Sequence, residues 1–320
     1  MDMRMNWSFL SFGKASAQGV RTAVVVKSDG VALAQVDTTK ARPRLQHCQF
    51  RAVSEAQLAD TLATLGRQYG LGKAACHTVM PLGSYSLLLI EAPEVPANEL
   101  RAAVRWRIRE LIDFHIDDAV LDVFDAPASG ARTTQTHLYV VVSRSNDVKQ
   151  LADRLQDAGI GLGVIDIPEL ALRNVAAQLP EDAQGVALLY FSAERGLIAL
   201  CRNQTLYLAR TLDIGQTRLQ EAAADGQTEA LFDALALEVQ RSLDYYDRTF
   251  QQAPISHLLI APLAEPVPGL VEGLRANLGL QARMLELSEV VDGAEQVSAE
   301  QAAQCLLAIG AALRCESKTL

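Results

Sequence analysis

The sequence predicts an α/β protein made of two halves, each a mixed β-sheet flanked by helices. Three observations support this fold class. Each half opens with a β-rich run broken by tight turns, at 22–36 and again at 186–211. Helical and β-type apolar patterns then alternate along each half, as they do in α/β proteins. A polar stretch with a proline and a glycine, 179–185, separates the two series and marks the expected boundary.

Length, charge and cysteine usage bound the class of protein. The 320 residues are 49% apolar and 21% charged, which is ordinary for a globular chain and enough for two domains. The net charge of −9 argues against binding along a phosphate backbone, so no nucleic-acid partner is expected. The five cysteines are scattered without a CxxC pair, which indicates free thiols in a reducing compartment and no metal site.

No part of the sequence is long and apolar enough to predict a membrane span. The N-terminus has only a short apolar run, carries Asp2 and lacks a small-residue cleavage site, so it is a poor signal peptide. Its aromatic residues Trp7, Phe9 and Phe12 could contact a membrane surface. A lead-in to the first strand, packed on the domain, is the simpler expectation.

The first half is expected to begin with a β-hairpin, in which strands at 22–26 and 31–36 flank the turn Ser28-Asp29-Gly30. A helix over 54–69 is expected because Ser54 can cap it and leucines recur on one side. The remaining patterns predict strands at 45–50, 76–81, 85–91, 136–143 and 160–167, and helices at 144–158 and 168–178.

The most strongly patterned stretch is 98–125. Its first part predicts a helix capped by Asn98, with an inner stripe formed by Leu100, Ala103, Val104, Ile108, Leu111 and Ile112. Arg101, Arg105 and Arg109 fall four apart on another side of that helix. After Phe114 the apolar residues alternate through Asp125, which predicts a strand. We expect this unit to lie in a small subdomain, about 85–160, inserted in a first half that spans 1–183.

The second half, 184–320, predicts a similar alternation. Strands are expected at 186–191, 196–202, 204–211, 256–261 and 281–287, and helices at 228–250, 270–278 and 299–313. The helix over 228–250 is the longest and has a broad apolar face.

Two halves that each open with a hairpin favour an actin-like ATPase arrangement, in which the opening turns hold the phosphates of a nucleotide. Such turns need inward backbone N–H groups and an aspartate, usually as D-x-G. The first turn offers Asp29-Gly30 but no D-x-G, and in the second half Tyr190 and Ser192 stand where the acid and glycine belong. A bulky aromatic there would fill phosphate space. Asp213-Ile214-Gly215 spells D-x-G but follows the third strand, so it is expected to be a turn.

Other catalytic patterns are also missing. Asp117, Asp118 and Asp122 form a dense acidic group, and carboxylate pairs can carry out acid–base chemistry. They are expected on a turn and on the solvent face of a strand, so a solvated acidic surface is the simpler reading. The charges on the helix over 228–250 fall at salt-bridge spacing, and no GxSxG motif supports a catalytic triad. We therefore expect no catalytic residues.

Several segments resemble the PilM-type pilus assembly proteins, in the family's order. They include 99–124 with Trp106 in its helix and IDDAVLD after it, 238–246 (EVQRSLDYY), 268–270 (PGL) with 278–280 (LGL), 307–314 (LAIGAALR) and 8–14. Within this family the segments resemble the MSHA-pilus branch, MshI, and more distantly GspL of type II secretion. The resemblance implies an actin-like ATPase fold of the FtsA/PilM type, with a reduced subdomain in the second half.

The chain departs from the family's pattern in four parts of one nucleotide site. The family's D-I-G-x-x-x-x-K turn is absent around 25–30, and its D-x-G is replaced at 190–192. Its glycine-rich loop is replaced by 261–265, and a subdomain with a ribose-side Glu and Lys is trimmed to 216–227. This pattern suggests a pseudo-ATPase: no cofactor is expected, and ATP binding is in doubt.

The resemblance implies a cytoplasmic scaffold in a type IV (MSHA-like) pilus assembly complex, peripheral to the inner membrane. Such a protein grips the cytoplasmic tail of a PilN-like membrane partner beside the small subdomain; the assembly ATPase is a further candidate partner, and a homodimer stays open. By position, the candidate contact residues are Arg101, Arg105, Arg109, Asp117, Asp118 and Asp122. The alternatives are an active actin-like ATPase and an unrelated α/β metabolic enzyme.

Overall fold

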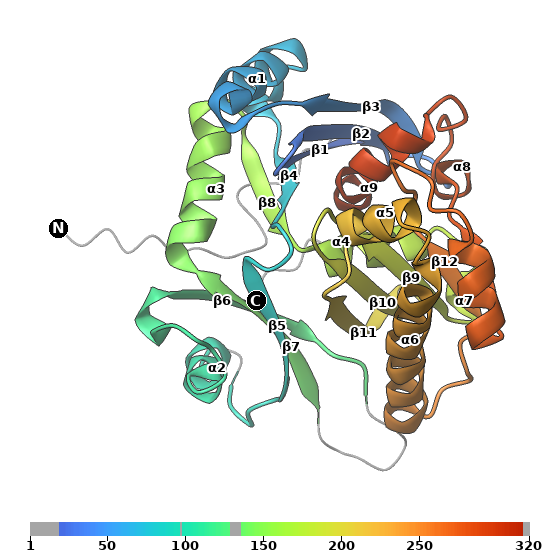
Figure 1. Ribbon diagram of the computed structural model, residues 1–320. Coiled ribbons are helices and arrows are strands. Elements are labelled where there is room, and N and C mark those ends of the chain that lie inside the picture. Colours follow the sequence, from blue (N-terminus) through green and yellow to red (C-terminus); the bar gives the residue numbers. More distant parts are fainter. Residues whose placement is uncertain (1–18, 97, 129–135, 316–320) are drawn as a thin grey trace.

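The computed structural model describes residues 19–96, 98–128 and 136–315. The described strands form two five-stranded mixed sheets and one three-stranded sheet, with helices around and between them (Figure 1). This arrangement confirms the predicted two-half α/β fold. The residues Trp7, Phe9 and Phe12, for which a membrane contact was considered, lie outside the described residues.

The first sheet has the strand order β3-β2-β1-β4-β8. Its strands are β1 (Val20–Lys27), β2 (Gly30–Asp37), β3 (Arg44–Ala52), β4 (Cys76–Val79) and β8 (Leu162–Asp166). The predicted hairpin is β1 and β2, which pair antiparallel from Val20–Asp37 to Lys27–Gly30. Gly30 has φ +158°, and a Cβ there would lie 2.2 Å from the carbonyl oxygen of Arg51, so the turn leaves space for glycine alone.

Helices α1 (Glu55–Gln68) and α3 (Ser145–Asp157) cover one face of this sheet, with the 3₁₀ turn η1 (Leu71–Lys73) beside them. Ser54 is the N-cap residue of α1, as predicted. The expected stripe of Leu58, Leu62 and Leu65 is fully inside the core.

The segment expected to form a small subdomain, a division that stays a prediction, contains the three-stranded sheet β5 (Tyr85–Glu91), β7 (His137–Arg144) and β6 (Ala119–Asp125), in the order β5-β7-β6. Helix α2 (Leu100–Ile108) packs on one face, and the 3₁₀ turn η2 (Ile116–Asp118) leads into β6. Two expectations are wrong. The N-cap residue is Glu99 rather than Asn98, and α2 ends before Leu111, which is 57% exposed instead of continuing the inner stripe.

The second sheet has the order β11-β10-β9-β12-β13. Its strands are β9 (Val186–Phe191), β10 (Gly196–Arg202), β11 (Thr205–Leu212), β12 (His257–Ile260) and β13 (Gln281–Met284). The elements beside it are η3 (Pro180–Ala183), α5 (Gln216–Ala224), α6 (Thr228–Phe250), α7 (Leu270–Leu278) and α8 (Leu287–Val290). The patterns predicted α6 and α7 with the observed bounds but missed α5 and the single turn α8, and the strand predicted over 281–287 ends at Met284. Among the described helices, none has both the length and the apolar composition that a bilayer crossing requires.

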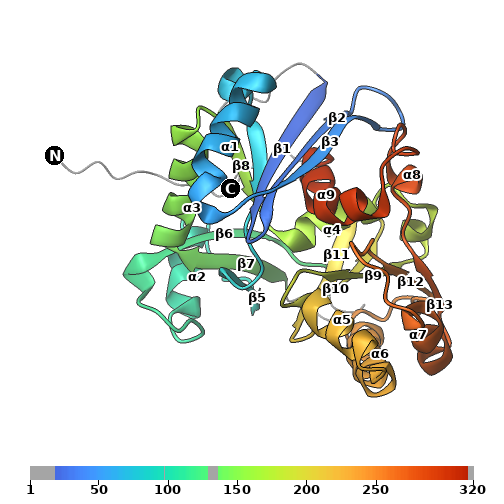
Figure 2. The same cartoon turned by 45° about the horizontal axis from the view of Figure 1, so that its top comes forward.

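Two helices, α4 (Pro168–Ala176) and α9 (Ala299–Ala312), lie between the two large sheets (Figures 1 and 2). They pack on each other so closely that a Cβ on Gly310 would lie 2.3 Å from the carbonyl oxygen of Ala171. Asn174 donates a hydrogen bond from Nδ2 to the Gly310 carbonyl at 2.9 Å. The largest core cluster runs from one sheet to the other through these helices. The boundary expected at 183/184 stays a prediction.

Candidate functional site

A groove of about 470 Å³ lies where the small subdomain meets the first half. It is lined by Arg101, Ala102, Arg105, Ala119, Val120, Leu121 and Ser145. These residues come from α2, from the first three residues of β6 and from the start of α3, which are neighbours in Figure 1. The groove therefore contains two of the three arginines that the sequence singled out.

Arg101 forms a partly buried ion pair across the edge of the small sheet. Its Nη2 lies 3.2 Å from Oδ1 of Asp122, and the two side chains are 33% and 3% exposed. The same Oδ1 also accepts a hydrogen bond from the backbone N–H of Val123 at 3.0 Å. Burial raises the pKa of Asp122, and the backbone donor and Arg101 oppose that rise.

The buried position of Asp122 corrects the expectation that it lies on a solvent face. The alternation of residues in β6 predicted one buried face and one solvent-exposed face. In fact α2 packs on the face that includes Leu121 and Val123. On the opposite face Val120 contacts the core beneath α1 and α3, and Phe124 contacts the core between the two large sheets. Both faces are covered, so the acid needs a cation. Asp122 is not available to a partner.

Arg105 fastens the helix to the start of β6. Its Nη1 donates to the carbonyl of Ala119 at 3.1 Å, and its Nη2 donates to the carbonyl of Ile116. Nη2 also lies 3.8 Å from Oδ1 of Asp117, whose side chain is 80% exposed. Asp118 is exposed too, so the acidic turn is solvated as predicted, next to the groove.

Arg109 does not reach the groove, because α2 ends one residue before it. Its guanidinium lies 5.1 Å from the ring centroid of Trp106, and its charged neighbour is the exposed Glu110 at 3.7 Å. Trp106 itself is 72% exposed, which the sequence reasoning missed. The signal was present: Trp106 falls between the arginines and off the stripe of apolar residues.

The outer edge of β6 is a second feature of this site. Within the described residues β6 pairs with β7 alone, so its other side offers backbone groups that no strand uses. Two backbone groups of β6 are already engaged by side chains: the N–H of Val123 donates to Asp122, and the carbonyl of Ala119 accepts from Arg105. An open strand edge beside a groove is the geometry that binds an extended peptide by adding a strand. Arg101 and Arg105 stand over the beginning of this edge and can contribute further donors.

A larger cavity, about 650 Å³, lies between the two halves. Its wall includes the first hairpin turn, the turn after β9, and residues from the first turn of α5 and the middle of α9. Tyr190 contributes to the wall but is only 5% exposed, because its ring packs in the core between the sheets. The expected filling of this space by Tyr190 is therefore not what the structure has. The cleft is open.

The turn after β9 uses its own backbone donors. The N–H of Ser192 donates to the carbonyl of Arg195 at 2.8 Å, and the N–H of Arg195 donates to Oγ of Ser192 at 3.1 Å. Donors that are engaged inside the turn cannot bind a phosphate without breaking those bonds. Asp213 is exposed, and Gly215 is the N-cap of α5, so the D-x-G found there is the predicted turn into the next helix.

The charges in the cleft do not favour a polyphosphate either. Lys27 of the first hairpin donates from Nζ to Oε1 of Gln304 and lies 3.9 Å from Asp29. Burial lowers its pKa, which disfavours the ammonium form. The wall carries three carboxylates, on Asp29, Glu194 and Glu265, against the two cations of Lys27 and Arg195.

One buried acid near the cleft has no ion-pair partner within the part of the chain that the structure describes. Glu169, in the first turn of α4, is 3% exposed, and the Tyr85 hydroxyl donates to its Oε2 at 2.5 Å. Burial raises the pKa of this carboxyl to about 7, against the effect of the Tyr85 hydrogen bond. This pair joins β5 of the small subdomain to the helix between the sheets.

Comparison with known proteins agrees with the resemblance to the PilM type that the sequence indicated. The family model of the type IV pilus assembly protein PilM matches residues 49–227. This match includes the small subdomain and the groove.

Among solved structures, a PilM-PilN type IV pilus biogenesis complex matches with a TM-score of 0.74 and 19% identity, over 92% of this chain and 97% of that chain. The cytoplasmic domain of EpsL, an inner membrane component of the Vibrio cholerae type II secretion system, gives a TM-score of 0.48 and 13% identity over 82% and 96%. A Bacteroides thetaiotaomicron protein with an actin-like ATPase fold gives 0.49 and 8% over 92% and 100%. No curated protein matches the chain.

Proposed function

We propose that this chain, which belongs to the PilM family of type IV pilus assembly proteins, is a cytoplasmic scaffold subunit that grips the tail of a PilN-like inner-membrane protein. The actin-like fold of two mixed-sheet halves flanked by helices provides the frame, and it is the fold of the matched PilM. In this proposal the protein reaches the membrane through its partner.

The groove beside α2 and β6 is the observation that carries this proposal. It combines an open strand edge with two arginines whose guanidinium groups are held in place by Asp122 and by backbone carbonyls. An extended tail can bond to the edge of β6 through its backbone and place an acid or a carbonyl near Arg101 and Arg105. Pre-positioned cations cost little entropy on binding, which favours specificity for one tail.

A peptide titration tests this site. The N-terminal cytoplasmic tail of a PilN-like protein from the same pilus operon, labelled at its far end, is titrated with the full chain by fluorescence anisotropy. We expect micromolar binding. Ala102→Trp, which fills the groove from α2, should weaken binding at least about tenfold, a loss of roughly 1.4 kcal/mol. Ala59→Trp places the same ring at an exposed position of α1, outside the groove, and should bind as the parent does.

The result distinguishes the proposal from its rivals. If no membrane subunit of the operon binds, the scaffold function is wrong. If the tail binds and Ala102→Trp has the affinity of the parent, the function stands and the groove is the wrong surface.

We further propose that the chain is a pseudo-ATPase. Three observations support the proposal. The N–H groups of the turn after β9 are hydrogen-bonded within the turn, and Lys27 is bonded to Gln304. The wall of the cleft also carries more carboxylates than cations. The open volume of the cleft favours the alternative, an active ATPase, because cavities of this size hold nucleotides. A Mg-ATP titration by calorimetry decides: tight binding would overturn the proposal, and no heat up to millimolar nucleotide supports it.

Within the family we propose the MSHA-pilus branch, on the motifs at 238–246, 268–280 and 307–314. Co-purification from cells that carry both an MSHA-type and another type IV pilus operon tests the branch, since only the MSHA subunits should be recovered. The same experiment shows whether the assembly ATPase is present. Exposed Trp106 and Leu111 provide an apolar surface for a homodimer, which sedimentation of the purified chain would detect.

A further inference from the structure

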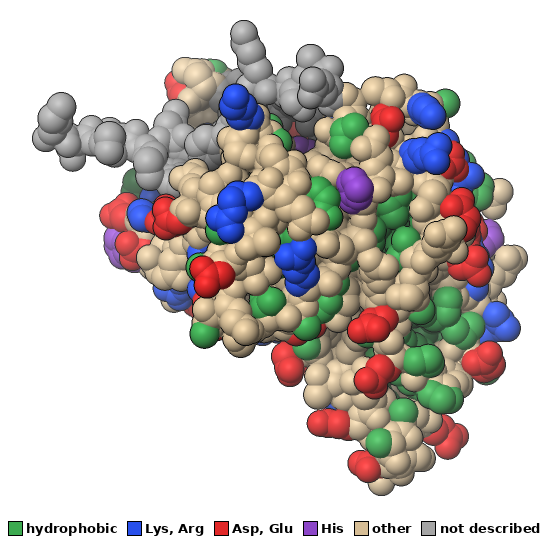
Figure 3. Space-filling model, turned by 90° about the horizontal axis from the view of Figure 1, so that it is seen from above, with side chains coloured by type: hydrophobic (Ala, Val, Ile, Leu, Met, Phe, Trp, Pro, Cys, Tyr) green, Lys and Arg blue, Asp and Glu red, His purple; other side chains and the backbone are tan. Residues whose placement is uncertain are grey.

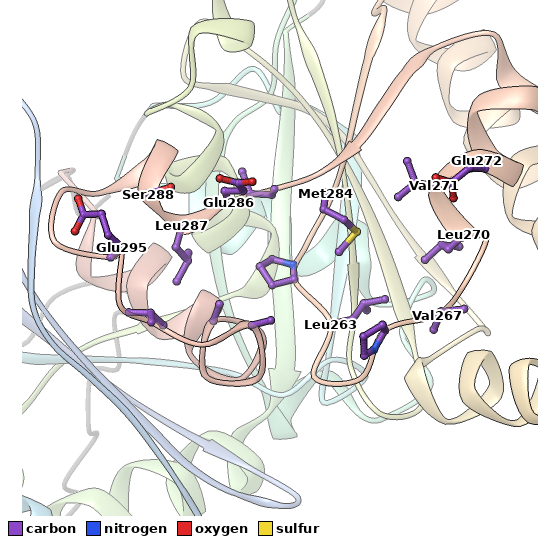
Figure 4. Close-up of a pocket in the computed structure, with 17 residues that line it drawn as sticks. Leu263, Val267, Leu270, Val271, Glu272, Met284, Glu286, Leu287, Ser288 and Glu295 are labelled. Atoms are coloured by element: carbon purple, nitrogen blue, oxygen red, sulfur yellow. The ribbon is translucent and has the colours of Figure 1, made fainter.

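An apolar pocket of about 470 Å³ lies at the far side of the second half from the groove, next to α7 and α8. Its wall is formed by 262–267, by α7, by 284–288 and by the segment 294–302 that leads into α9. Figure 4 shows Leu263, Met284 and Leu287 around the middle of the pocket. In the view from above, apolar side chains gather on the side of the molecule that holds these helices (Figure 3).

The margin of this pocket is acidic. Glu272, Glu286 and Glu295 line it, all three are exposed, and the lining includes no lysine or arginine. No ion pair joins any of the three to a described residue, although Arg42, which donates to the carbonyl of Ser288 in the pocket wall, and Arg44 lie close enough to lower the pKa of Glu295. Backbone N–H groups lower the pKa of Glu295, so it keeps its charge. An apolar hollow with unpaired carboxylates at its margin fits a ligand with aromatic or aliphatic side chains between cations.

The chain itself contains such a segment, which ends five residues before the first described residue, Gly19. Trp7, Phe9, Leu10 and Phe12 lie between Arg4 and Lys14, with Asp2 as the one acid in this stretch. The two cations flank the aromatic run, as the carboxylates flank the pocket.

The first described residue lies at the same end of the molecule as one margin of the pocket. The carbonyl of Gly19 accepts a hydrogen bond from Thr38 at 2.7 Å, at the edge where β2 passes into β3. The N–H of Leu45, at the start of β3, donates to the carbonyl of Asp292 at 2.8 Å, and Ala294 of the pocket wall is two residues further on. Figure 2 shows the start of β1, the β2–β3 connection and the chain after α8 at the same end of the molecule.

The chain between Phe12 and Gly19 is long enough to span the distance to the pocket. Crossing from β1 over β2 and β3 to the chain at Asp292 takes three strand spacings, roughly 15 Å. The seven residues from Phe12 to Gly19 can span up to about 24 Å when extended. Phe12 can therefore reach the pocket without any rearrangement of the described chain.

We propose that this pocket is the docking site of the chain's own segment Arg4–Lys14, with the aromatic side chains in the hollow and the two cations beside the glutamates. The segment then covers the apolar surface of α7 and α8 and connects the edge of the first sheet to the second half. This inference is independent of the proposed partner tail, which binds at the opposite side of the molecule.

Tryptophan fluorescence of the full chain tests the proposal. The chain has two tryptophans, and Trp106 is exposed, so Trp106→Phe leaves Trp7 as the only reporter at little structural cost. We expect Trp7 emission to be blue-shifted from that of a free tryptophan amide and several-fold less quenched by acrylamide. A Trp7 that emits and quenches like the free amide overturns the proposal.

Pocket variants locate the reporter. In the Trp106→Phe background, Val271→Glu and the double change Glu286→Lys with Glu295→Lys should each return Trp7 to free-like quenching. Glu300→Lys is the matched control, because Glu300 is an exposed acid in the first turn of α9 that does not line the pocket. Circular dichroism shows which variants fold, and the surface double change keeps the test valid if Val271→Glu does not.

Three other outcomes each overturn the proposal. A buried Trp7 that ignores all pocket variants lies elsewhere on the chain. A burial that disappears on dilution places the segment in the pocket of a second copy. A Trp7 that is free in solution and shifts only when anionic vesicles are added is a membrane contact.

Discussion

Removing the guanidinium of Arg101 should leave the Asp122 carboxylate buried without a cation. Breaking a buried ion pair from one side costs about 3–5 kcal/mol when both groups are inside the protein. Here Asp122 is buried but the Arg101 side chain is 33% exposed, and Asp122 keeps its hydrogen bond from Val123. Both facts reduce the cost, so we expect Arg101→Ala to lower the free energy of unfolding by roughly 2 kcal/mol, about thirtyfold in the unfolding constant.

Urea denaturation followed by circular dichroism measures this loss. Arg109→Ala is the matched control, since it removes an exposed arginine of the same helix region whose partner is also exposed, and it should cost no more than about 0.5 kcal/mol. Adding Asp122→Asn to Arg101→Ala removes the uncompensated charge and should restore most of the stability. Because burial raises the pKa of Asp122, low pH protonates this carboxyl and removes the uncompensated charge. The stability that Arg101→Ala loses relative to the parent protein should therefore be smallest at low pH and grow as pH rises.

Two results would refute this reasoning. An Arg101→Ala variant as stable as the Arg109→Ala variant would mean that Asp122 is solvated or paired elsewhere. A double variant no more stable than Arg101→Ala would mean that the loss comes from packing of the arginine stem rather than from charge.

Three further predictions concern the interior. Glu169 has its pKa raised to about 7, so its contribution to stability is full below about pH 4.5 and is lost as pH rises through about 7, by up to roughly 3 kcal/mol. Glu169→Gln should flatten that part of the stability–pH curve measured by urea denaturation, and an unchanged curve would contradict the assignment. Gly310→Ala should destabilise by roughly 1–3 kcal/mol, although alanine normally favours a helix, because its Cβ would lie 2.3 Å from the Ala171 carbonyl oxygen; a higher melting temperature would show that α4 and α9 can separate at no cost. Arg314→Ala should cost at least about 3 kcal/mol in the same assay, since the fully buried carboxylate of Asp166 lies 3.0 Å from Nη1, and a near-neutral result would contradict the pairing.

Local signals fixed most of the secondary structure. Turn-forming and capping residues, such as Gly279 at the end of α7, mark the ends of several elements. They predict the observed bounds of the strands 85–91, 186–191 and 196–202 and of the helices 228–250 and 270–278. The predictions are wrong where tertiary contacts determine the end of a helix or the burial of a side chain. Leu111 continues a helical pattern but α2 has already ended, and Asp122 alternates like a surface residue on a sheet that is covered twice.

The candidate site could be predicted only in part, for a similar reason. Spacing by four brings Arg101 and Arg105 to one side of α2 and into the groove, but it says nothing about where the helix ends, so Arg109 was included wrongly. The open cleft is built from segments that lie more than a hundred residues apart in the sequence. The pocket beside α7 is built from segments about thirty residues apart. Local periodicity in the sequence does not show which distant segments come together in the fold.

The position of α9 has a consequence for how the protein is made. Residues 299–312 cover the face of the first sheet that includes Ala23, Ala32 and Ala34, so that face has no cover while the chain emerges from the ribosome. Strands β1 to β8 are complete by residue 166, and more than a hundred further residues must be added before α9 exists. At about 5–20 residues per second the nascent sheet waits roughly 7–30 seconds with an apolar surface in solution. Translation is thus the period of greatest aggregation hazard, and a chain cut short just before residue 299 would never leave it.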